Sequence, residues 1–187
     1  METNKAVAAY IAEIFGEAVG VNAHKSEDGG KEIAVLRCAN VPQEGVQSCA
    51  SIGLNGTDIG LVSGGKKLRV EVVGACDVQV DVFENMVAST AYAVMDAGKC
   101  YPGFVAENVV GLYVESEMKH VLLTSPFLWN GMETMALEDR YIAWLMMVPV
   151  SEAEYAYAKK MGADALEERF AEENIDIYHL YRKSIIE

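Results

Sequence analysis

Hydrophobic side chains recur every three or four residues in two segments of the chain, which is the spacing of one face of an α-helix. The first segment covers residues 4–19, and the second runs from Val82 to Ala97. Gly20 and Gly98 follow the two segments and suit the backbone at a helix end. The two apolar stripes are Val7, Tyr10, Ile11, Ile14, Phe15 and Ala18, and Phe83, Met86, Val87, Thr90, Ala91, Val94 and Met95. Two long amphipathic helices are therefore expected.

Shorter apolar runs, bounded by glycine, proline or charged clusters, predict the strands of a sheet. These runs are Ile33–Ala39, Val46–Leu54, Leu68–Val72, Val109–Val114, Val121–Leu123 and Tyr141–Val148. In the third run, Arg69 and Glu71 alternate with apolar residues, which predicts a half-buried strand. On its polar face, a structural ion pair or a network of polar side chains is favoured over a catalytic pair. The run that begins at Tyr141 is apolar on both faces, so we place it in the interior of a sheet that is covered on both sides.

Glycine and charged residues mark the expected connections between these elements. The charged segment 24–31 is a predicted loop, and residues 53–65, which contain five glycines, are expected to form a loop or a hairpin tip. Gly64-Gly65-Lys66 lacks the upstream glycine and the following serine or threonine of a phosphate-binding loop, so no nucleotide site is predicted there.

The last third of the chain changes from strand to helix periodicity. Ser151 with Glu154 has the spacing of a capping box, and Asp164 with Glu167 repeats it, so two short helices are expected after the interior strand. The length fits a single domain, residues 1–187. The predicted fold class is α+β, with a mixed, mostly antiparallel sheet and helices packed on it.

The charge of the chain favours a protein partner over other macromolecules. It carries 28 acidic and 15 basic side chains, which gives a net charge of −13. Such a surface repels a nucleic-acid backbone and an anionic membrane and attracts a basic protein. Between Tyr101 and Tyr157 there are eight acids and two bases. Acidity also serves solubility alone in many cytoplasmic proteins, so the charge does not by itself identify a partner.

The cysteine and histidine spacings predict neither a metal site nor a bound cofactor. Cys38, Cys49, Cys76 and Cys100 have no C-x-x-C pairing, and none lies at ligand spacing from a histidine. We expect small buried side chains in a reducing cytoplasm. The apolar runs are shorter than the ~20 residues of a membrane span, and the N-terminal segment is amphipathic rather than a signal peptide. The expected location is therefore the cytoplasm.

Motifs for covalent or acid–base catalysis are absent from the sequence, so no catalytic residue is predicted. There is no G-x-S-x-G motif, and the adjacent Glu138 and Asp139 would point to opposite faces of an extended segment rather than share a proton.

His120 is either a structural histidine at a strand start or a contact to a partner, and Trp129 is either core or a binding anchor. The candidate partner-binding residues are Glu115, Glu117, His120, Trp129, Glu138 and Asp139.

Several segments in a fixed order resemble the suppressor-of-fused-like domain family. The resemblance extends from about Glu32 onward. It rests on Leu68-Arg69-Val70-Glu71-Val72-Val73-Gly74, Lys119 to Pro126, Trp144 to Ser151, Glu154-Tyr155, Gly162 with Leu166, Asp176, and Arg182-Lys183-Ser184. The family consists of interaction modules and implies no catalytic residues. Its single-domain bacterial members resemble immunity proteins, which bind and neutralise secreted toxins encoded by neighbouring genes, often with nuclease tips.

Three hypotheses follow from these observations. The preferred one is an immunity protein whose acidic surface covers a basic toxin domain, and it predicts one negative face near Glu115, Glu138 and Asp139. The alternative is a general regulatory module that binds a short extended peptide along a sheet edge. An enzyme with a dispersed active site is the third.

Overall fold

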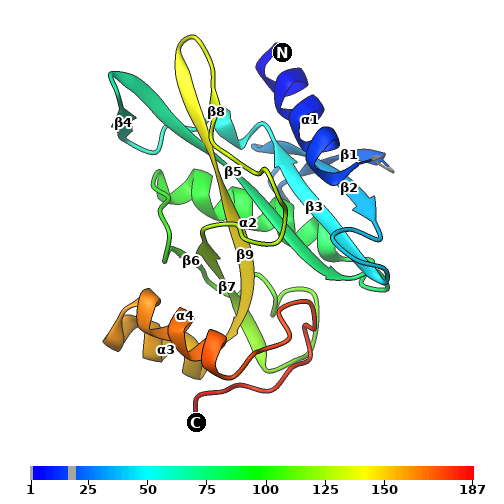
Figure 1. The fold of residues 1–187 in the computed structure, drawn as a ribbon, viewed down its shortest axis with the longest axis vertical. Coiled ribbons are helices and arrows are strands. Elements are labelled where there is room, and N and C mark those ends of the chain that lie inside the picture. The colour runs from blue at the N-terminus through cyan, green and yellow to red at the C-terminus, as the bar shows by residue number, and fades with distance from the viewer. Residues whose placement is uncertain (1, 17–19) are drawn as a thin grey trace.

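One mixed sheet forms the centre of the molecule in the computed structural model, which describes residues 2–16 and 20–187 (Figure 1). The helices are α1 (Glu2–Phe15), α2 (Phe83–Ala97), α3 (Glu152–Met161) and α4 (Ala163–Glu172), with a 3₁₀ turn at Leu54–Gly56. The strands are β1 (Gly20–Lys25), β2 (Glu32–Ala39), β3 (Val46–Ile52), β4 (Leu61–Ser63), β5 (Lys66–Asp77), β6 (Val105–Ala106), β7 (Met118–Thr124), β8 (Met135–Ala136) and β9 (Arg140–Ser151).

The strand order confirms the predicted fold class. The main sheet runs β1-β2-β3-β5-β9-β7-β6, with β4 paired to β5 and β8 paired to β9. Only the β5–β9 pair is parallel among the described strands, and the other pairs are antiparallel. The strand that begins near Tyr141 is β9, and it lies between β5 and β7 in the interior of the sheet, as its two apolar faces predict.

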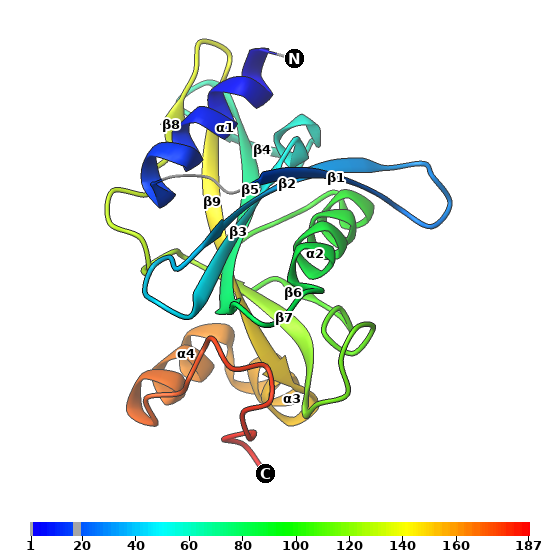
Figure 2. The same ribbon diagram turned by 90° about the vertical axis from the view of Figure 1, so that its right-hand side faces the viewer.

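Helices cover both faces of the sheet and divide the core in two. On one face, Val87 of α2 packs with Val72 and Leu145. On the other face, Ile11 of α1 and Leu166 of α4 belong to the same apolar cluster. Figure 2 shows α1 and α2 on opposite sides of the strands, with α3 and α4 at the end of the molecule that also holds the C-terminus. Both predicted long helices are confirmed, although residues 17–19 of the first lie outside the described part of the chain.

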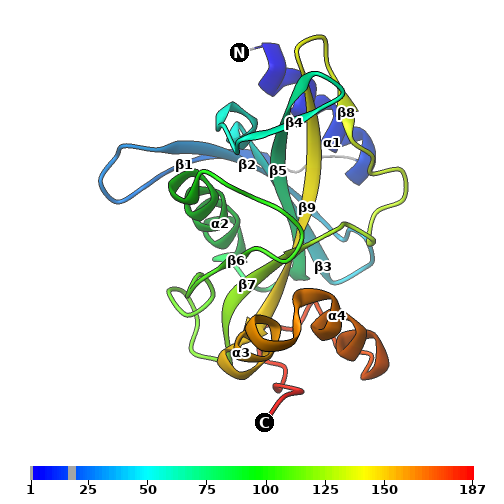
Figure 3. The same ribbon diagram turned by 90° about the vertical axis from the view of Figure 1, so that its left-hand side faces the viewer.

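The segment 24–31 contains the end of a strand as well as a loop, so the prediction of a loop throughout was wrong. Strand β1 reaches Lys25 and pairs with β2, and the two form a hairpin that projects from the body of the molecule (Figure 3). The turn is closed by Asp28, whose carboxylate accepts hydrogen bonds from Ser26 and from the backbone N–H of Gly30. Strand β1 lies at the sheet edge with Val21 and its neighbours exposed, so it lacks the alternating pattern of a half-buried strand.

Residues 109–114 form turns rather than the predicted strand. The backbone N–H groups of Val110 and Gly111 both donate to the carbonyl of Lys119, and Leu112 donates to Asn108. Val110 is buried and Leu112 is 65% exposed, so the apolar run is divided between core and solvent. The chain pairs with β7 slightly earlier, through the two residues of β6.

One of the two predicted capping boxes is present. The Ser151 hydroxyl accepts a hydrogen bond from the backbone N–H of Glu154, and the Glu154 carboxylate accepts one from the Ser151 backbone. The second prediction was wrong, because α4 begins directly after Gly162, where no side chain caps it. Gly162 has φ 99°, a conformation that glycine adopts easily, and this lets α3 and α4 follow each other without a loop. Glu167 instead accepts a hydrogen bond from Thr124 on β7 at 2.8 Å.

Arg69 and Glu71 do not pair with each other but take part in separate polar contacts, and β5 is buried on both faces rather than half-buried as predicted. Arg69 donates to Asp58 at 2.9 Å. Glu71 is fully buried and accepts hydrogen bonds from Ser51, from the backbone N–H groups of Gly53 and Asn55, and from the Asn55 side-chain amide. Burial raises the pKa of Glu71, and these four donors oppose the rise.

Candidate interaction surface

The acidic residues singled out by sequence lie at opposite ends of the fold. Glu138 and Asp139 occupy the turn between β8 and β9, whereas Glu115 and Glu117 precede β7. Met118 pairs with Ser151 at the far end of β9, so the length of this 12-residue strand, roughly 35 Å at ~3.3 Å per residue, separates the two groups (Figure 1). The expected single negative face near Glu115, Glu138 and Asp139 therefore does not form.

Two of these four carboxylates are paired with cations of the chain itself. Arg140 donates to Asp139 at 2.6 Å, and this hydrogen bond is the main reason why the pKa of Asp139 lies below its usual value. Lys183 donates to Glu117 at 2.5 Å and lowers the pKa of Glu117 in the same way. Glu115 and Glu138 are exposed and have no cationic partner among the described residues. The free negative charge at each end is thus smaller than the sequence suggests.

The side chain of His120 is buried and serves the fold. Its Nδ1 accepts a hydrogen bond from the backbone N–H of Asn108 at 2.9 Å, so Nε2 carries the hydrogen and donates to Glu152 at 2.8 Å. Its ring centroid lies 4.9 Å from that of Tyr155 on α3. His120 therefore joins the 107–111 turns to α3, and only its partner Glu152 is well exposed.

Trp129 is also inside the fold, with 6% of its surface exposed. Its indole N–H donates to the Ser48 hydroxyl at 2.9 Å, and its ring packs against Phe15 with centroids 5.5 Å apart. The exposed aromatic residue of this segment is Phe127, at 65% exposure. Of the two alternatives for Trp129, core or binding anchor, its burial supports core.

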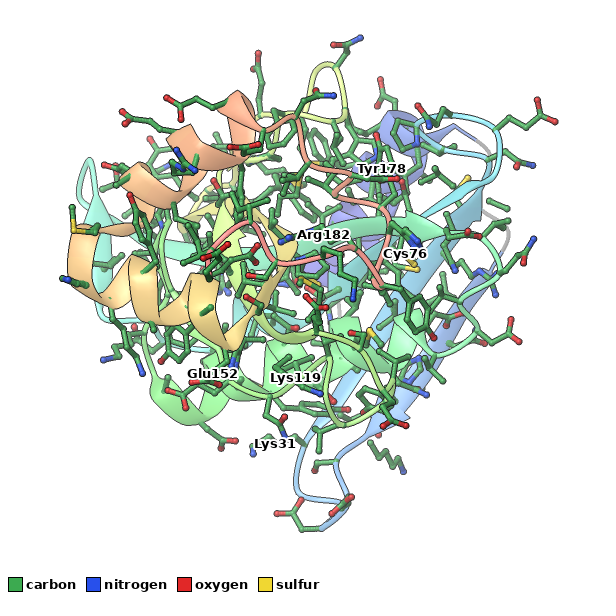
Figure 4. The ribbon with its side chains drawn as sticks, turned by 90° about the horizontal axis from the view of Figure 1, so that it is seen from below. Lys31, Cys76, Lys119, Glu152, Tyr178 and Arg182 are labelled. Carbon is green, nitrogen blue, oxygen red and sulfur yellow. The ribbon has the colours of Figure 1, made fainter. Side chains whose placement is uncertain are left out.

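A buried ion pair fixes the chain's C-terminal segment against the sheet, and sequence reasoning missed it. Arg182 donates to both carboxylate oxygens of Glu154, at 2.6 and 2.8 Å, and also to the carbonyl of Pro149 at 2.7 Å. Glu154 further accepts from the backbone N–H of Ile185. Figure 4 shows Arg182 on the C-terminal segment next to α3. We call the region formed by α3, α4, residues 173–187 and residues 115–117 the C-terminal end of the fold. The Arg182–Glu154 pair joins the last segment of this region to α3.

Exposed acids outnumber bases at the C-terminal end. The acids are Glu115, Glu117, Glu152, Asp164, Glu168, Glu172, Glu173, Asp176 and Glu187. The bases there are Lys159, Lys160, Arg169 and Lys183. Arg169 is already bound to Glu172 and Glu173, and Lys183 to Glu117. Most of the unpaired negative charge of this end therefore faces solvent.

Two apolar grooves open on the surface. One, of about 270 Å³, lies beside α4 and is lined by Leu122, Phe127, Val148, Phe170, Ile175 and Ile177. The other, of about 290 Å³, crosses β5 and β9, with Leu61 and Tyr101 exposed among its lining residues. Grooves of this kind are where protein side chains or short segments dock.

The described residues contain no group of three or more histidine, cysteine or acidic side chains that could hold a metal ion. Burial raises the pKa of the thiols of Cys49 and Cys76, and that of Cys100 to about 12, so these three stay protonated and unreactive at neutral pH. In the same part of the chain, no helix combines the length and the apolar character needed to cross a bilayer.

Comparison with known proteins supplies the family. The suppressor of fused protein (SUFU) family matches residues 29–183 of the chain. The protein belongs to this family. It is 30% identical to the immunity protein YqcF of Bacillus subtilis (strain 168) over 188 residues, an alignment that covers 99% of this chain and 98% of YqcF.

Solved structures of SUFU proteins share the fold of this family member. A SUFU homologue from Neisseria gonorrhoeae superposes with a TM-score of 0.75 at 17% identity, covering 100% of this chain and 98% of the homologue. A chain of the Sufu–Fu complex gives 0.66 at 12% identity, with 97% and 91% covered. Drosophila Suppressor of Fused gives 0.57 at 12% identity and is matched over 42% of its length by 82% of this chain.

Proposed function

We propose that this SUFU-family protein is an immunity protein, which binds a cognate secreted toxin in the cytoplasm and neutralises it by stoichiometric protein–protein binding. The observation that carries the proposal is the 30% identity to immunity protein YqcF along nearly the whole of both chains. The target that best suits the charge of the chain is a basic toxin domain, with a nuclease as the favoured class, because nucleases present a basic groove to their substrate.

The C-terminal end of the fold is the part of the surface that we assign to the toxin. Its exposed acids Glu115, Glu152 and Glu168 form no ion pair with a lysine or arginine among the described residues, although Glu152 is bound to His120. Glu138 and Asp139 lie at the far end of β9, so they do not belong to this contact. His120 and Trp129 are buried and act on the surface only through the elements that they hold in place.

The proposal is tested by co-expression with the toxin's C-terminal domain, taken from the gene adjacent to that of this protein. We expect cells that produce the toxin domain alone to stop growing and cells that also produce this protein to grow normally. A purified complex should contain one copy of each chain. Growth arrest that persists despite equal amounts of this protein would contradict the proposal.

Salt gives a further expected result. Because unpaired acids at the C-terminal end attract a basic partner, the association rate constant with the toxin domain should fall about tenfold or more between 50 and 500 mM NaCl. The dissociation rate constant should change much less. Stopped-flow or surface plasmon resonance measures both constants, and an association rate that is indifferent to salt would show that these charges do not steer the encounter.

A regulatory module that binds a short peptide is the second candidate, and the groove across β5 and β9 favours it. Leu61 is 43% and Tyr101 is 50% exposed at this groove, and an extended peptide could use both as apolar contacts. Such a module would bind a linear peptide with an affinity that salt leaves unchanged. Binding to a folded basic domain that weakens in salt favours the immunity function instead.

A further inference from the structure

The groove beside α4 combines an apolar interior with an acidic margin. Its lining comes from β7, β9, the 125–128 segment, α4 and residues 174–177. We propose that this groove receives one large apolar side chain of a basic protein segment, whose flanking lysine or arginine side chains meet the acids of α4. The proposal rests on the proposed immunity function, in which the toxin supplies that segment.

The interior of the groove suits a single side chain. Phe170 is largely buried at its floor, whereas Phe127 stands 65% exposed at its rim. Ala171 is an exposed lining residue with only a methyl side chain, so it leaves the groove open on the side of α4. The volume of about 270 Å³ is close to the lower end of the roughly 300–1,000 Å³ that ligand sites occupy. A groove of this size has room for one large apolar side chain.

Helical geometry places carboxylates on the lip of this groove. Successive residues of a helix are turned by ~100°, so Glu167, Phe170 and Ala171 share the groove side of α4. Asp164 and Glu168 lie three residues before Glu167 and Ala171, so they are their neighbours on the exposed surface of α4, although neither lines the groove. The acidic lip thus consists of Glu167 in the lining and these two acids next to it.

The lip has no internal cation to balance it. Arg169 projects from the opposite side of α4, where it binds Glu172 and Glu173. Among the described residues, no lysine or arginine forms an ion pair with Asp164, Glu167 or Glu168. One carboxylate oxygen of Glu167 accepts a hydrogen bond from Thr124 at 2.8 Å. The other oxygen accepts no hydrogen bond from the described residues.

The groove across β5 and β9 also has one carboxylate in its lining, Glu133, among mainly apolar side chains. None of its lining residues belongs to α3, α4 or residues 173–187, so it lies outside the acid-rich C-terminal end of the fold. Apolar burial supplies affinity for an anchor, and unpaired acids beside it select a partner with positive flanks and speed its arrival. Beside α4, the apolar groove adjoins the excess of exposed acids at the C-terminal end, so both terms act together there.

A peptide titration tests the groove without any toxin. The probe is a five-residue peptide with a central phenylalanine between two lysines and two arginines, and the control peptide has alanine at the centre. In ¹H–¹⁵N spectra of the full chain, the phenylalanine peptide should shift the amide signals of Thr124, Val148, Ala171 and Ile177. These shifts should shrink at least threefold in 500 mM NaCl and with the alanine peptide. Equal shifts with both peptides, or shifts confined to other surfaces, would overturn the proposal.

Two variants then test whether the toxin binds at the groove. Ala171→Arg fills the groove, and Glu168→Lys reverses one charge of its acidic lip. Each should weaken toxin binding at least tenfold. Glu27→Lys, at the exposed tip of the β1–β2 hairpin, makes the same change in net charge as Glu168→Lys and should leave binding within twofold. All three positions are exposed, and an unchanged unfolding transition shows that each variant folds.

The outcomes separate the two proposals. If the wild-type chain neutralises the toxin and both groove variants bind it equally well, the groove assignment is wrong and the immunity function stands. If the wild-type chain does not neutralise the toxin, the immunity function is wrong, and the peptide titration still decides what the groove binds.

Discussion

Arg182→Met is expected to destabilise the folded chain by about 3–5 kcal/mol, because it leaves the fully buried Glu154 carboxylate without its cation. The wild-type guanidinium donates to both Glu154 oxygens and to the Pro149 carbonyl, and methionine can replace none of these bonds. The loss should also loosen residues 183–187, since Ile185 is hydrogen-bonded to the same carboxylate. Urea unfolding at pH 7, followed by circular dichroism, measures the change in free energy.

Two companion variants sharpen this test. Arg182→Lys keeps the charge but loses the bidentate geometry, so its loss of stability should be intermediate. Arg169→Met removes an arginine from exposed ion pairs at 3.4 and 3.3 Å, and it should change the free energy of unfolding by less than about 1 kcal/mol. An Arg182→Met chain as stable as the Arg169→Met chain would show that the buried pair does not hold the C-terminal end.

Glu71→Ala is expected to cost at least about 4 kcal/mol, since it leaves four buried hydrogen-bond donors without an acceptor, at about 1–3 kcal/mol for each group. The donors are the Ser51 hydroxyl, the backbone N–H groups of Gly53 and Asn55, and the Asn55 amide. Glu71→Gln should be far milder. Its carbonyl oxygen can accept from the same groups as Oε1, and its NH₂ can donate to Ser51.

The pH dependence of Glu71→Gln gives the sharper result. Burial raises the pKa of Glu71 above 4.5, so the folded state holds its proton at pH values where the unfolded state has lost it. The wild-type chain therefore loses stability as the pH rises from below 4.5 through the folded pKa, and glutamine abolishes that loss. The stability of the glutamine variant relative to wild type should increase with pH over this window. A difference that does not vary with pH would mean that the pKa of Glu71 is not raised.

Strong periodicity made the helices and the interior strands predictable. The stripe that includes Val87 defined α2 because a helix buries every third or fourth residue, and the two apolar faces of β9 defined its interior position. The strand predicted for residues 109–114 was wrong because hydrogen bonds to β7, which a local pattern does not reveal, hold this segment in turns. The backbone N–H groups of Val110 and Gly111 donate to Lys119, and those of Leu112 to Val114 donate within the turns. Lys119 lies in β7, whose position depends on its long-range pairing with β9. Strand β1 was not predicted, because a strand at an exposed sheet edge needs no alternation of apolar and polar residues.

The candidate surface was harder to predict than the fold, since charge counts carry no positions. Glu117 and Asp139 are acidic in sequence and paired in space, with Lys183 and Arg140. The groove beside α4 joins segments from Leu122 to Ile177, so only folding reveals it. One signal was present in the sequence: the spacing of residues 167, 170, 171 and 174 is that of a helix face, next to acids at 164 and 168.

Titration of purified toxin domain with this protein tests the central claim most directly. At concentrations far above the dissociation constant, toxin activity should fall linearly and reach zero at one molar equivalent. Both chains should be recovered unmodified from the complex, because inhibition occurs by occupancy. Full toxin activity at a several-fold excess of this protein, or loss of activity at a small fraction of an equivalent, would contradict stoichiometric neutralisation by binding.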